Sequence, residues 1–289
     1  MYQIDPSIAD NFKIRASALS SIMGGSTLEN GLTSNQKVEL DELLSKQAAG
    51  LKPLTVKQMD KLSELTQKFN AKPELPSGAK TYCENWLKES IAMYNRRVEV
   101  STKYMQKGLI MEDEAIDFIA DYYGFGFLVK NEERKENDYM TGCCDIDIPS
   151  KSLIIDNKCS YDQGTFPIFE TKIPNTTYEL QGQAYMELYN RDHFWLIYTL
   201  VDTPLHIIER ECRNYAYSTG HEMNKDLMDE FVAKMTYKDI PNELKIKRFI
   251  IERDRSLPAK IEQRVKMCRD YIKSLITTLN NQFSSLESF

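Results

Sequence analysis

Residues 142–158 constrain the fold more than any other stretch, because they read as one β-hairpin with two chemically different faces: G-C-C-D-I-D-I-P-S-K-S-L-I-I-D-N-K. If residues 149–152 form the turn, Ile146 pairs with Ile155 and Asp145 with Asp156. One face is then wholly apolar and predicted to face a core; it carries Ile146, Ile148, Leu153 and Ile155. The other face is charged apart from Ile154; it carries Asp145, Asp147, Asp156 and Lys158.

This pairing places two carboxylates opposite each other, with Cβ atoms about 5 Å apart. Like charges at that separation destabilise a hairpin unless a positive group lies between them, and a divalent cation with oxygen ligands, Mg²⁺ or Mn²⁺, is one solution. Lys158 follows Asp156 by two residues and points to the same face, where it could bind a phosphate or orient a water. A solvent-exposed polar face on an edge hairpin explains the pattern equally well.

Two helical segments favour the metal site. Glu112 shares a helical face with Ala115, Ile116 and Ile119, and a carboxylate on such an apolar face is costly unless it is paired or binds a cation. Gln181 and Tyr185 form an i,i+4 pair, and Gln is an unusual choice for an apolar stripe. The structural alternatives are a frayed first turn that exposes Glu112 and a Gln that bonds to backbone at a helix start.

The first third of the chain is predicted to be helical. A short helix is expected within residues 12–25, with Ser17 near its N-cap and two glycines at its end. Residues 32–46 and 54–68 then repeat the pattern L-T-x-x-Q-x-x-x-L-x-E-L-x-x-K, in which Thr33 with Gln36 and Thr55 with Gln58 are candidate capping boxes. We interpret the repeat as a helical hairpin, most simply a structural arm, with an arm that contacts DNA or a partner as the alternative. A longer helix is predicted over residues 81–107.

Strand patterns begin after residue 124. Strands are predicted at residues 125–130, 143–148, 153–159, 194–201 and 246–251, with a helix at 176–190. The last helix, residues 258–283, has apolar residues spaced four and three apart, which indicates core packing or, alternatively, a subunit interface. The predicted class is therefore α/β (α+β), with a central mixed sheet flanked by helices.

Composition limits the setting and the partners. The chain has 289 residues and a net charge of −6, which disfavours non-specific DNA binding over the whole surface but allows a local basic groove. The six cysteines have no paired metal-ligand spacing, so reduced thiols are expected. No secretory signal and no stretch long enough to span a bilayer is visible, so we expect a cytoplasmic protein and no membrane partner.

The order of these groups resembles that of the PD-(D/E)XK nucleases, in particular the phage lambda exonuclease family. The similar segments are Arg15-Ala16-Ser17, residues 108–115, Asp156-Asn157-Lys158-Cys159, residues 178–186 and residues 250–254. Each is weak alone, but five in the right order form a specific pattern. The resemblance covers residues 10–25 and 105–275. It implies a restriction-endonuclease-like core and one nuclease domain over residues 1–289. Within that domain it predicts a helical insertion at 26–104, a catalytic core at 105–255 and a C-terminal amphipathic helix at 256–289.

The resemblance also implies roles for single residues. Glu112, Asp145, Asp156 and the carbonyl of Asn157 would bind Mg²⁺ or Mn²⁺, Lys158 would position or deprotonate the attacking water, and Gln181 and Tyr185 would orient Lys158 or the phosphate. Arg15 and Ser17 would contact the DNA backbone. Asp156 stands where the family usually has Glu, and Cys143-Cys144 replaces Ser-Pro, so recognition of a 5′-phosphate does not carry over.

The activity implied is hydrolysis of double-stranded DNA from its ends, 5′ to 3′, in phage-type recombination or repair in a bacterial host. A ring-like homo-oligomer such as a trimer and a single-strand annealing protein as partner are also implied. Two alternatives stay open: an endonuclease with the same core, and an inactive nuclease fold that serves as a DNA-binding module. An iron–sulfur nuclease is disfavoured, because four suitably placed cysteines do not flank the core.

Overall fold

The computed structural model describes residues 3–25, 28–50, 53–91 and 101–286. The chain forms two compact units, each described here by itself. The sheet unit comprises residues 97–137 and 141–254, and the helical unit comprises residues 1–96, 138–140 and 255–289. That residues 1–289 act as one nuclease domain stays a prediction. No helix in the described residues is both long and apolar enough to cross a membrane.

The sheet unit is built on a mixed sheet of four strands in the order β4-β5-β6-β7. These strands are β4 (Ile146–Ile148), β5 (Leu153–Cys159), β6 (His193–Thr199) and β7 (Ile246–Glu252). β4 and β5 are antiparallel and pair Ile146 with Ile155 and Ile148 with Leu153, which confirms the predicted register. β5 runs parallel to β6, and β7 is antiparallel to β6. The turn between β4 and β5 is a 3-10 helix, Pro149–Lys151, followed by Ser152 at a φ of 49°.

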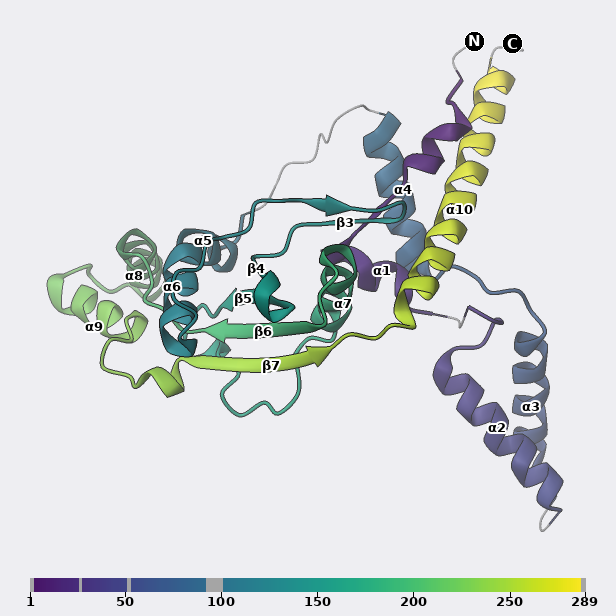
Figure 1. Cartoon of the computed structure of the whole chain (residues 1–289), viewed down its shortest axis with the longest axis horizontal. Coiled ribbons are helices and arrows are strands. Elements are labelled where there is room, and N and C mark those ends of the chain that lie inside the picture. Colours follow the sequence, from purple (N-terminus) through teal and green to yellow (C-terminus); the bar gives the residue numbers. More distant parts are fainter. Residues whose placement is uncertain (1–2, 26–27, 51–52, 92–100, 287–289) are drawn as a thin grey trace. The chain divides into compact units, whose positions relative to one another are not determined.

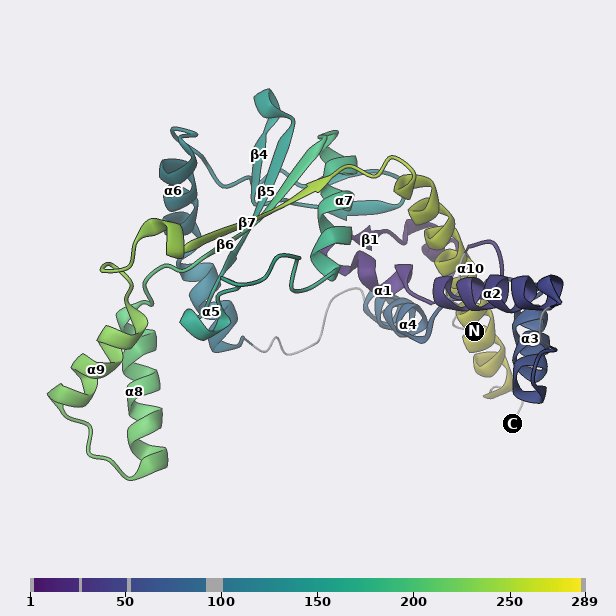
Figure 2. The ribbon, with the colours of Figure 1, turned by 90° about the horizontal axis from the view of Figure 1, so that it is seen from below.

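Two helices cover opposite faces of this sheet (Figure 2). α6 (Glu112–Tyr123) packs on the apolar face, where Ile116 and Ile119 meet Ile155 and Ile197. α7 (Thr177–Tyr189) packs on the other face, the one that carries Asp156 and Lys158. Because successive residues of β5 point to opposite faces, the hairpin buries Ile155 and the isoleucines of β4 under α6 and presents Asp156 and Lys158 toward α7. The predicted mixed sheet flanked by helices is thus confirmed.

Several elements of this unit were not predicted. α8 (Leu205–Thr219) and α9 (Lys225–Met235) pack together around Ile207, Ile208 and Met235. The short strands β2 (Lys135–Glu136) and β3 (Met140–Gly142) pair antiparallel. A 3-10 helix, Asn242–Leu244, precedes β7, and another, Gln163–Thr165, follows β5.

The predicted strand at residues 125–130 is wrong: this segment is irregular. Gly124 and Gly126 both adopt a positive φ, of 67° and 72°, so the chain turns where an extended run was expected. The aromatic residue that suggested a strand, Phe125, instead packs by its side chain against Trp195 and Tyr123. The strand predicted at 143–148 is also shorter, because only residues from Ile146 onward pair with β5.

The helical unit contains η1 (Pro6–Asn11), β1 (Ile14–Arg15), η2 (Ala16–Ala18), α1 (Leu19–Met23), α4 (Ser77–Ile91) and α10 (Leu257–Leu286). α10 packs against α4, and Ile261, Val265, Cys268 and Ile272 are buried, which confirms core packing for this part of the predicted stripe; its last two residues, Leu275 and Leu279, are only half-buried. Ser17 lies near the N-cap of α1 as predicted, but it is not the capping residue. A 3-10 turn precedes α1, so Ser17 lies within η2, and Ala18 takes the N-cap position without a side-chain bond.

The repeat forms two helices that lie side by side (Figure 1), α2 (Ser34–Ala49) and α3 (Val56–Phe69). Both predicted capping boxes are present, with Thr33 and Gln36 on α2 and Thr55 and Gln58 on α3. The pair has its own small core, which includes Leu32, Leu40, Leu43 and Leu65.

The prediction of one continuous helix over residues 81–107 is wrong, because α4 ends at Ile91 and α5 begins at Lys103. α5 (Lys103–Ile110) starts anew, because Thr102 caps it by accepting a hydrogen bond from Met105 N. Residues 92–100 of the predicted helix lie outside the described residues.

Candidate active site

The two aspartates of the hairpin come together as predicted from the register. Asp145 lies directly before β4, and Asp156 lies in the middle of β5. The backbone N–H of Asn157 donates to Asp145 Oδ2 at 2.8 Å, which fixes this carboxylate against the strand that carries Asp156. The exposed fraction of Asp156 is only 1%. The pair is therefore held in a low-dielectric environment, where like charges repel strongly.

Lys158 partly neutralises this pair by an ion pair between its Nζ and Asp156 Oδ2. Burial, and then the charge of Asp156, raise the pKa of Asp145 to about 7. Burial opposes a charge on Lys158, but Asp156 and Asp145 outweigh it and raise the pKa of Lys158 above its ordinary value. The single ammonium therefore leaves the site with excess negative charge, which a cation would relieve.

Gln181 and Tyr185 approach the site from α7. Gln181 Nε2 donates to Asp156 Oδ1 at 3.3 Å and is 3.0 Å from Tyr185 Oη. Both side chains are almost fully buried. Burial, and then the charge of Asp156, raise the pKa of Tyr185, so this hydroxyl keeps its proton. In this structure Gln181 contacts Asp156, whereas Lys158 lies with its Nζ 4.9 Å from the ring centroid of Tyr178.

Glu112 opens α6 and belongs to an acidic first turn, which the helix dipole favours. Its Oε2 pairs with Lys130 Nζ at 2.5 Å, and the Glu112 side chain is 19% exposed. The face behind it is apolar as predicted, since Ala115, Ile116 and Ile119 are buried.

A cleft of about 780 Å³ is lined by some of these groups, whereas Asp156, Gln181 and Tyr185 are not part of its lining. Its lining includes Glu112, Asp145, Asn157 and Lys158, together with four tyrosines. A volume of this order is typical of a small-molecule or cofactor site. The tyrosines give the cleft apolar walls beside its charged groups.

The donors in the cleft fit a hard divalent cation. In the residues that the structure describes, no three His, Cys, Asp or Glu side chains are gathered into a finished metal-binding cluster. However, Asp145 and Asp156 supply carboxylate oxygens that repel each other, and the buried Asp156 Oδ2 has no hydrogen bond in the described chain beyond its ion pair with Lys158. Carboxylate and carbonyl oxygens are the ligands that Mg²⁺ and Mn²⁺ prefer.

The two predicted contacts with the DNA backbone lie elsewhere in the chain. Arg15 and Ser17 belong to the helical unit, where both side chains are exposed.

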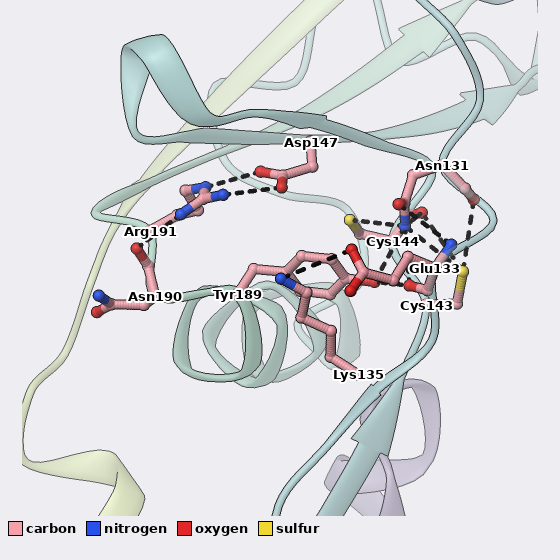
Figure 3. Close-up of polar contacts among 9 residues, drawn as sticks. All are labelled: Asn131, Glu133, Lys135, Cys143, Cys144, Asp147, Tyr189, Asn190 and Arg191. Carbon is pink, nitrogen blue, oxygen red and sulfur yellow. Dashed lines mark hydrogen bonds and ion pairs between the residues drawn. The ribbon is translucent and has the colours of Figure 1, made fainter.

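Asp147, on the charged face of the hairpin, forms a bidentate ion pair with Arg191 at 2.7 and 2.9 Å (Figure 3). Its carboxylate is thus already neutralised by the arginine.

Three residues near the site were missed by the sequence analysis. Lys130 pairs with Glu112, Asn131 bonds to the backbone before Asp145, and Tyr178 contacts Lys158. Lys130 and Asn131 lie in an irregular loop without periodicity, so no sequence signal marks them. Tyr178 lies one turn before Gln181 on the same helix, and its position could have been inferred from that spacing.

Three solved structures that are similar to this one are exonucleases or an exonuclease complex. The structure is similar to a phage-related exonuclease from Haemophilus somnus 129PT, with 29% sequence identity and a TM-score of 0.62 over 93% of this chain and 97% of that one. It is also similar to the alkaline exonuclease LHK-Exo from Laribacter hongkongensis, with 14% identity and a TM-score of 0.52 over 97% and 98% of the two chains. The complex of LHK-Exo with dAMP gives 13% identity and a TM-score of 0.53.

No protein-family model matches the sequence, and a comparison with curated proteins gives no significant match. The two LHK-Exo structures share the fold alone at their level of identity. The phage-related exonuclease adds both fold and sequence likeness over nearly the whole chain. The fold is therefore one that exonucleases have, and this likeness supports a nuclease.

Proposed function

We propose that this protein is a divalent-metal-dependent exodeoxyribonuclease that hydrolyses phosphodiester bonds from the ends of double-stranded DNA. The observation that carries the proposal is the pair of half-buried Asp145 and buried Asp156 with Lys158 beside it, next to a cleft that Asp145, Lys158 and Glu112 line. Two carboxylates and a lysine, on β5 and on the residue directly before β4, are suited to hydrolysis of a phosphate ester. The likeness to exonucleases supports the same chemistry.

Glu112, Asp145, Asp156 and the backbone carbonyl of Asn157 would hold Mg²⁺ or Mn²⁺. When bound, such an ion stabilises charge on a scissile phosphate and lowers the pKa of a coordinated water. Lys158 would bind a phosphate oxygen or position the attacking water. Gln181 would hold the Asp156 carboxylate in place, with Tyr185 bonded to its amide.

The finer features of the proposal rest on the family resemblance. They are 5′ to 3′ polarity, a ring-like homo-oligomer such as a trimer, contacts of Arg15 and Ser17 with the DNA backbone, and a single-strand annealing protein as partner in phage-type recombination. The setting would be the cytoplasm of a bacterial host. A ring would also account for DNA retention by a chain of net charge −6, because enclosure replaces part of the electrostatic affinity.

The test is digestion of linear and covalently closed circular double-stranded DNA with Mg²⁺ and with EDTA. We expect Mg²⁺-dependent loss of the linear DNA alone, and end-labelling then gives the polarity. Asp145→Ala and Lys158→Ala should each abolish this activity. Cutting of the circle would replace the proposal with an endonuclease, and cleavage of neither DNA would replace it with an inactive DNA-binding module.

A further inference from the structure

The irregular loop after α6 contacts two of the candidate metal-binding residues through consecutive residues, Glu112 at its carboxylate and Asp145 at its backbone. Lys130 Nζ pairs with Glu112 Oε2 at 2.5 Å. The next residue, Asn131, donates its backbone N–H to the carbonyl oxygen of Asp145 at 2.7 Å. The loop thus connects the first turn of α6 to the segment that enters β4.

The side chain of Asn131 strengthens the second connection (Figure 3). Its Nδ2 lies 3.0 Å from the carbonyl oxygen of Cys144, 3.0 Å from Tyr189 Oη and 3.2 Å from the carbonyl oxygen of Glu133. An amide group has two hydrogens, which these three acceptors share. Its Oδ1 accepts a hydrogen bond from Glu133 N at 3.3 Å. Asn131 therefore holds the backbone on both sides of the Cys144–Asp145 peptide.

Tyr189 extends the same network to α7. It is the last residue of that helix and is 2% exposed. Its hydroxyl donates to the carbonyl oxygen of Glu133, and Lys135 Nζ lies 4.9 Å from its ring centroid. Burial raises the pKa of Tyr189, so this hydroxyl remains a donor at neutral pH. The helix that carries Gln181 is thereby fixed at its C-terminal end to the loop of Asn131.

We propose that Asn131 is a positioning residue that sets the Asp145 carboxylate relative to Asp156 and Glu112, acting through the Cys144 carbonyl and the Tyr189 hydroxyl. The inference rests on the proposed function, because it assigns Asn131 to the geometry of that site. Asp145 lies before the paired part of β4, so the ladder to β5 does not fix it. Its carboxylate has one backbone donor, Asn157 N, and Asn131 supplies the bonds that hold its backbone.

The chain offers a matched control for a merely structural role. Asp147 and Arg191 form a bidentate ion pair that joins β4 to the residue two places after α7 (Figure 3). This contact links the same hairpin to the same end of the same helix but does not touch Asp145. Asp147→Asn therefore weakens the ion pair between β4 and the C-terminal end of α7 and leaves the hydrogen bonds of Asn131 in place.

The experiment compares the full-length protein with Asn131→Ala, Asn131→Asp, Tyr189→Phe and Asp147→Asn. For each protein, electron paramagnetic resonance gives the Kd of Mn²⁺, and initial rates on linear duplex DNA give kcat and KM. Urea denaturation gives the free energy of unfolding. Asn131→Asp keeps the side-chain shape and removes both donated hydrogens. Tyr189→Phe removes one hydroxyl and is the milder change if the Asn131 variants do not fold.

We expect Asn131→Ala and Asn131→Asp to raise the Mn²⁺ Kd and to lower kcat by about tenfold or more, with KM for DNA changed by less than about threefold. Tyr189→Phe should change both in the same direction. Asp147→Asn should lose stability with the Mn²⁺ Kd changed by less than about twofold. The inference would be overturned, and the proposed function would stand, if the Mn²⁺ Kd did not change in the Asn131 and Tyr189 variants. The same holds if the Mn²⁺ Kd rose equally in Asp147→Asn. A wild-type protein that neither binds Mn²⁺ nor cleaves DNA would overturn the proposed function and the inference with it.

Discussion

Gln181 Nε2 donates a hydrogen bond of 3.3 Å to Asp156 Oδ1, from the first half of α7 to the middle of β5. The two residues are 7% and 1% exposed, so the bond is shielded from water. A hydrogen bond to a buried charged group contributes more to stability than one between neutral groups. Gln181 therefore has a structural and a chemical role at once, because it holds the carboxylate that is a candidate metal ligand.

Replacing Gln181 by Leu should reduce activity more than it reduces stability. The change keeps a side chain of similar size but leaves Asp156 Oδ1 and the Tyr185 hydroxyl without this partner. We expect the free energy of unfolding to fall by about 1–3 kcal/mol and the Mg²⁺-dependent cleavage rate to fall by about 10- to 100-fold. Initial rates on end-labelled duplex DNA and urea unfolding measure the two effects. Cleavage at the wild-type rate would remove Gln181 from the site.

Gly182 should not tolerate a side chain, because α7 and β6 meet there. A Cβ built on this glycine would lie 2.4 Å from Cδ1 of the fully buried Phe194. Gly182→Ala must therefore move the helix or the ring, and overpacking of this kind costs about 1–3 kcal/mol. The shift would also displace Gln181, so we expect a lower rate of DNA cleavage, measured as initial rates on end-labelled duplex DNA.

Two further variants test the cause of that loss. Gly182→Ala combined with Phe194→Leu removes ring atoms from the contact and should recover part of the activity. Gly78→Ala in α4, where the nearest atom to a new Cβ is Ser21 O at 3.5 Å, should keep wild-type stability or exceed it. A Gly182→Ala protein as stable and active as wild type would mean that α7 is free to move.

The charged hairpin and the helical repeat were predictable because each rests on local rules. Alternation fixes the β4–β5 register, since a slip of one residue would turn Ile146 and Ile155 away from the core. The Asp145–Asp156 pair follows directly from that register. The capping boxes of Thr33 and Thr55 depend on four consecutive residues, so the sequence alone defines both helix starts.

Other features depend on tertiary contacts that the sequence does not encode locally. Phe125 suggested a strand, but it packs against Trp195 while Gly126 turns the backbone. Asn131 is one polar residue in a charged loop, and its importance comes from Cys144 and Tyr189, which are distant along the chain. The pairing of Lys130 with Glu112 is likewise a loop-to-helix contact without a spacing rule.

Thr33→Ala and Thr55→Ala should each loosen the repeat of α2 and α3. Each threonine accepts a hydrogen bond from the backbone of the third helical residue, and loss of such a cap costs about 1 kcal/mol. We expect faster amide hydrogen exchange in both helices, since they share the core around Leu40 and Leu65. Exchange in β5 and β6 should not change, and an effect there would show that the repeat does not unfold locally.

Lys107 lies outside the candidate site and is fully buried on α5. Its Nζ donates to the carbonyl oxygen of Tyr161 at 2.8 Å and lies 5.4 Å from the ring centroid of Tyr237. Burial lowers the pKa of Lys107 from 10.5 to about 8. Between these two values the unfolded chain binds more protons than the folded protein, so this lysine makes the free energy of unfolding rise with pH.

Lys107→Met removes the titrating group and keeps the apolar stem. The destabilisation from the buried charge is fully present below pH 8 and disappears as pH rises to 10.5. The unfolding free energy of the variant minus that of wild type should therefore decrease between pH 7 and pH 10, by on the order of 1–3 kcal/mol. Urea unfolding at several pH values measures this difference. Lys103→Met on the same helix is the control, because the hydrogen bond of Lys103 to Glu211 raises the pKa of this lysine. The difference in unfolding free energy between Lys103→Met and wild type should therefore stay constant from pH 7 to pH 10. A constant difference for Lys107→Met as well would mean that Lys107 titrates normally in the folded protein.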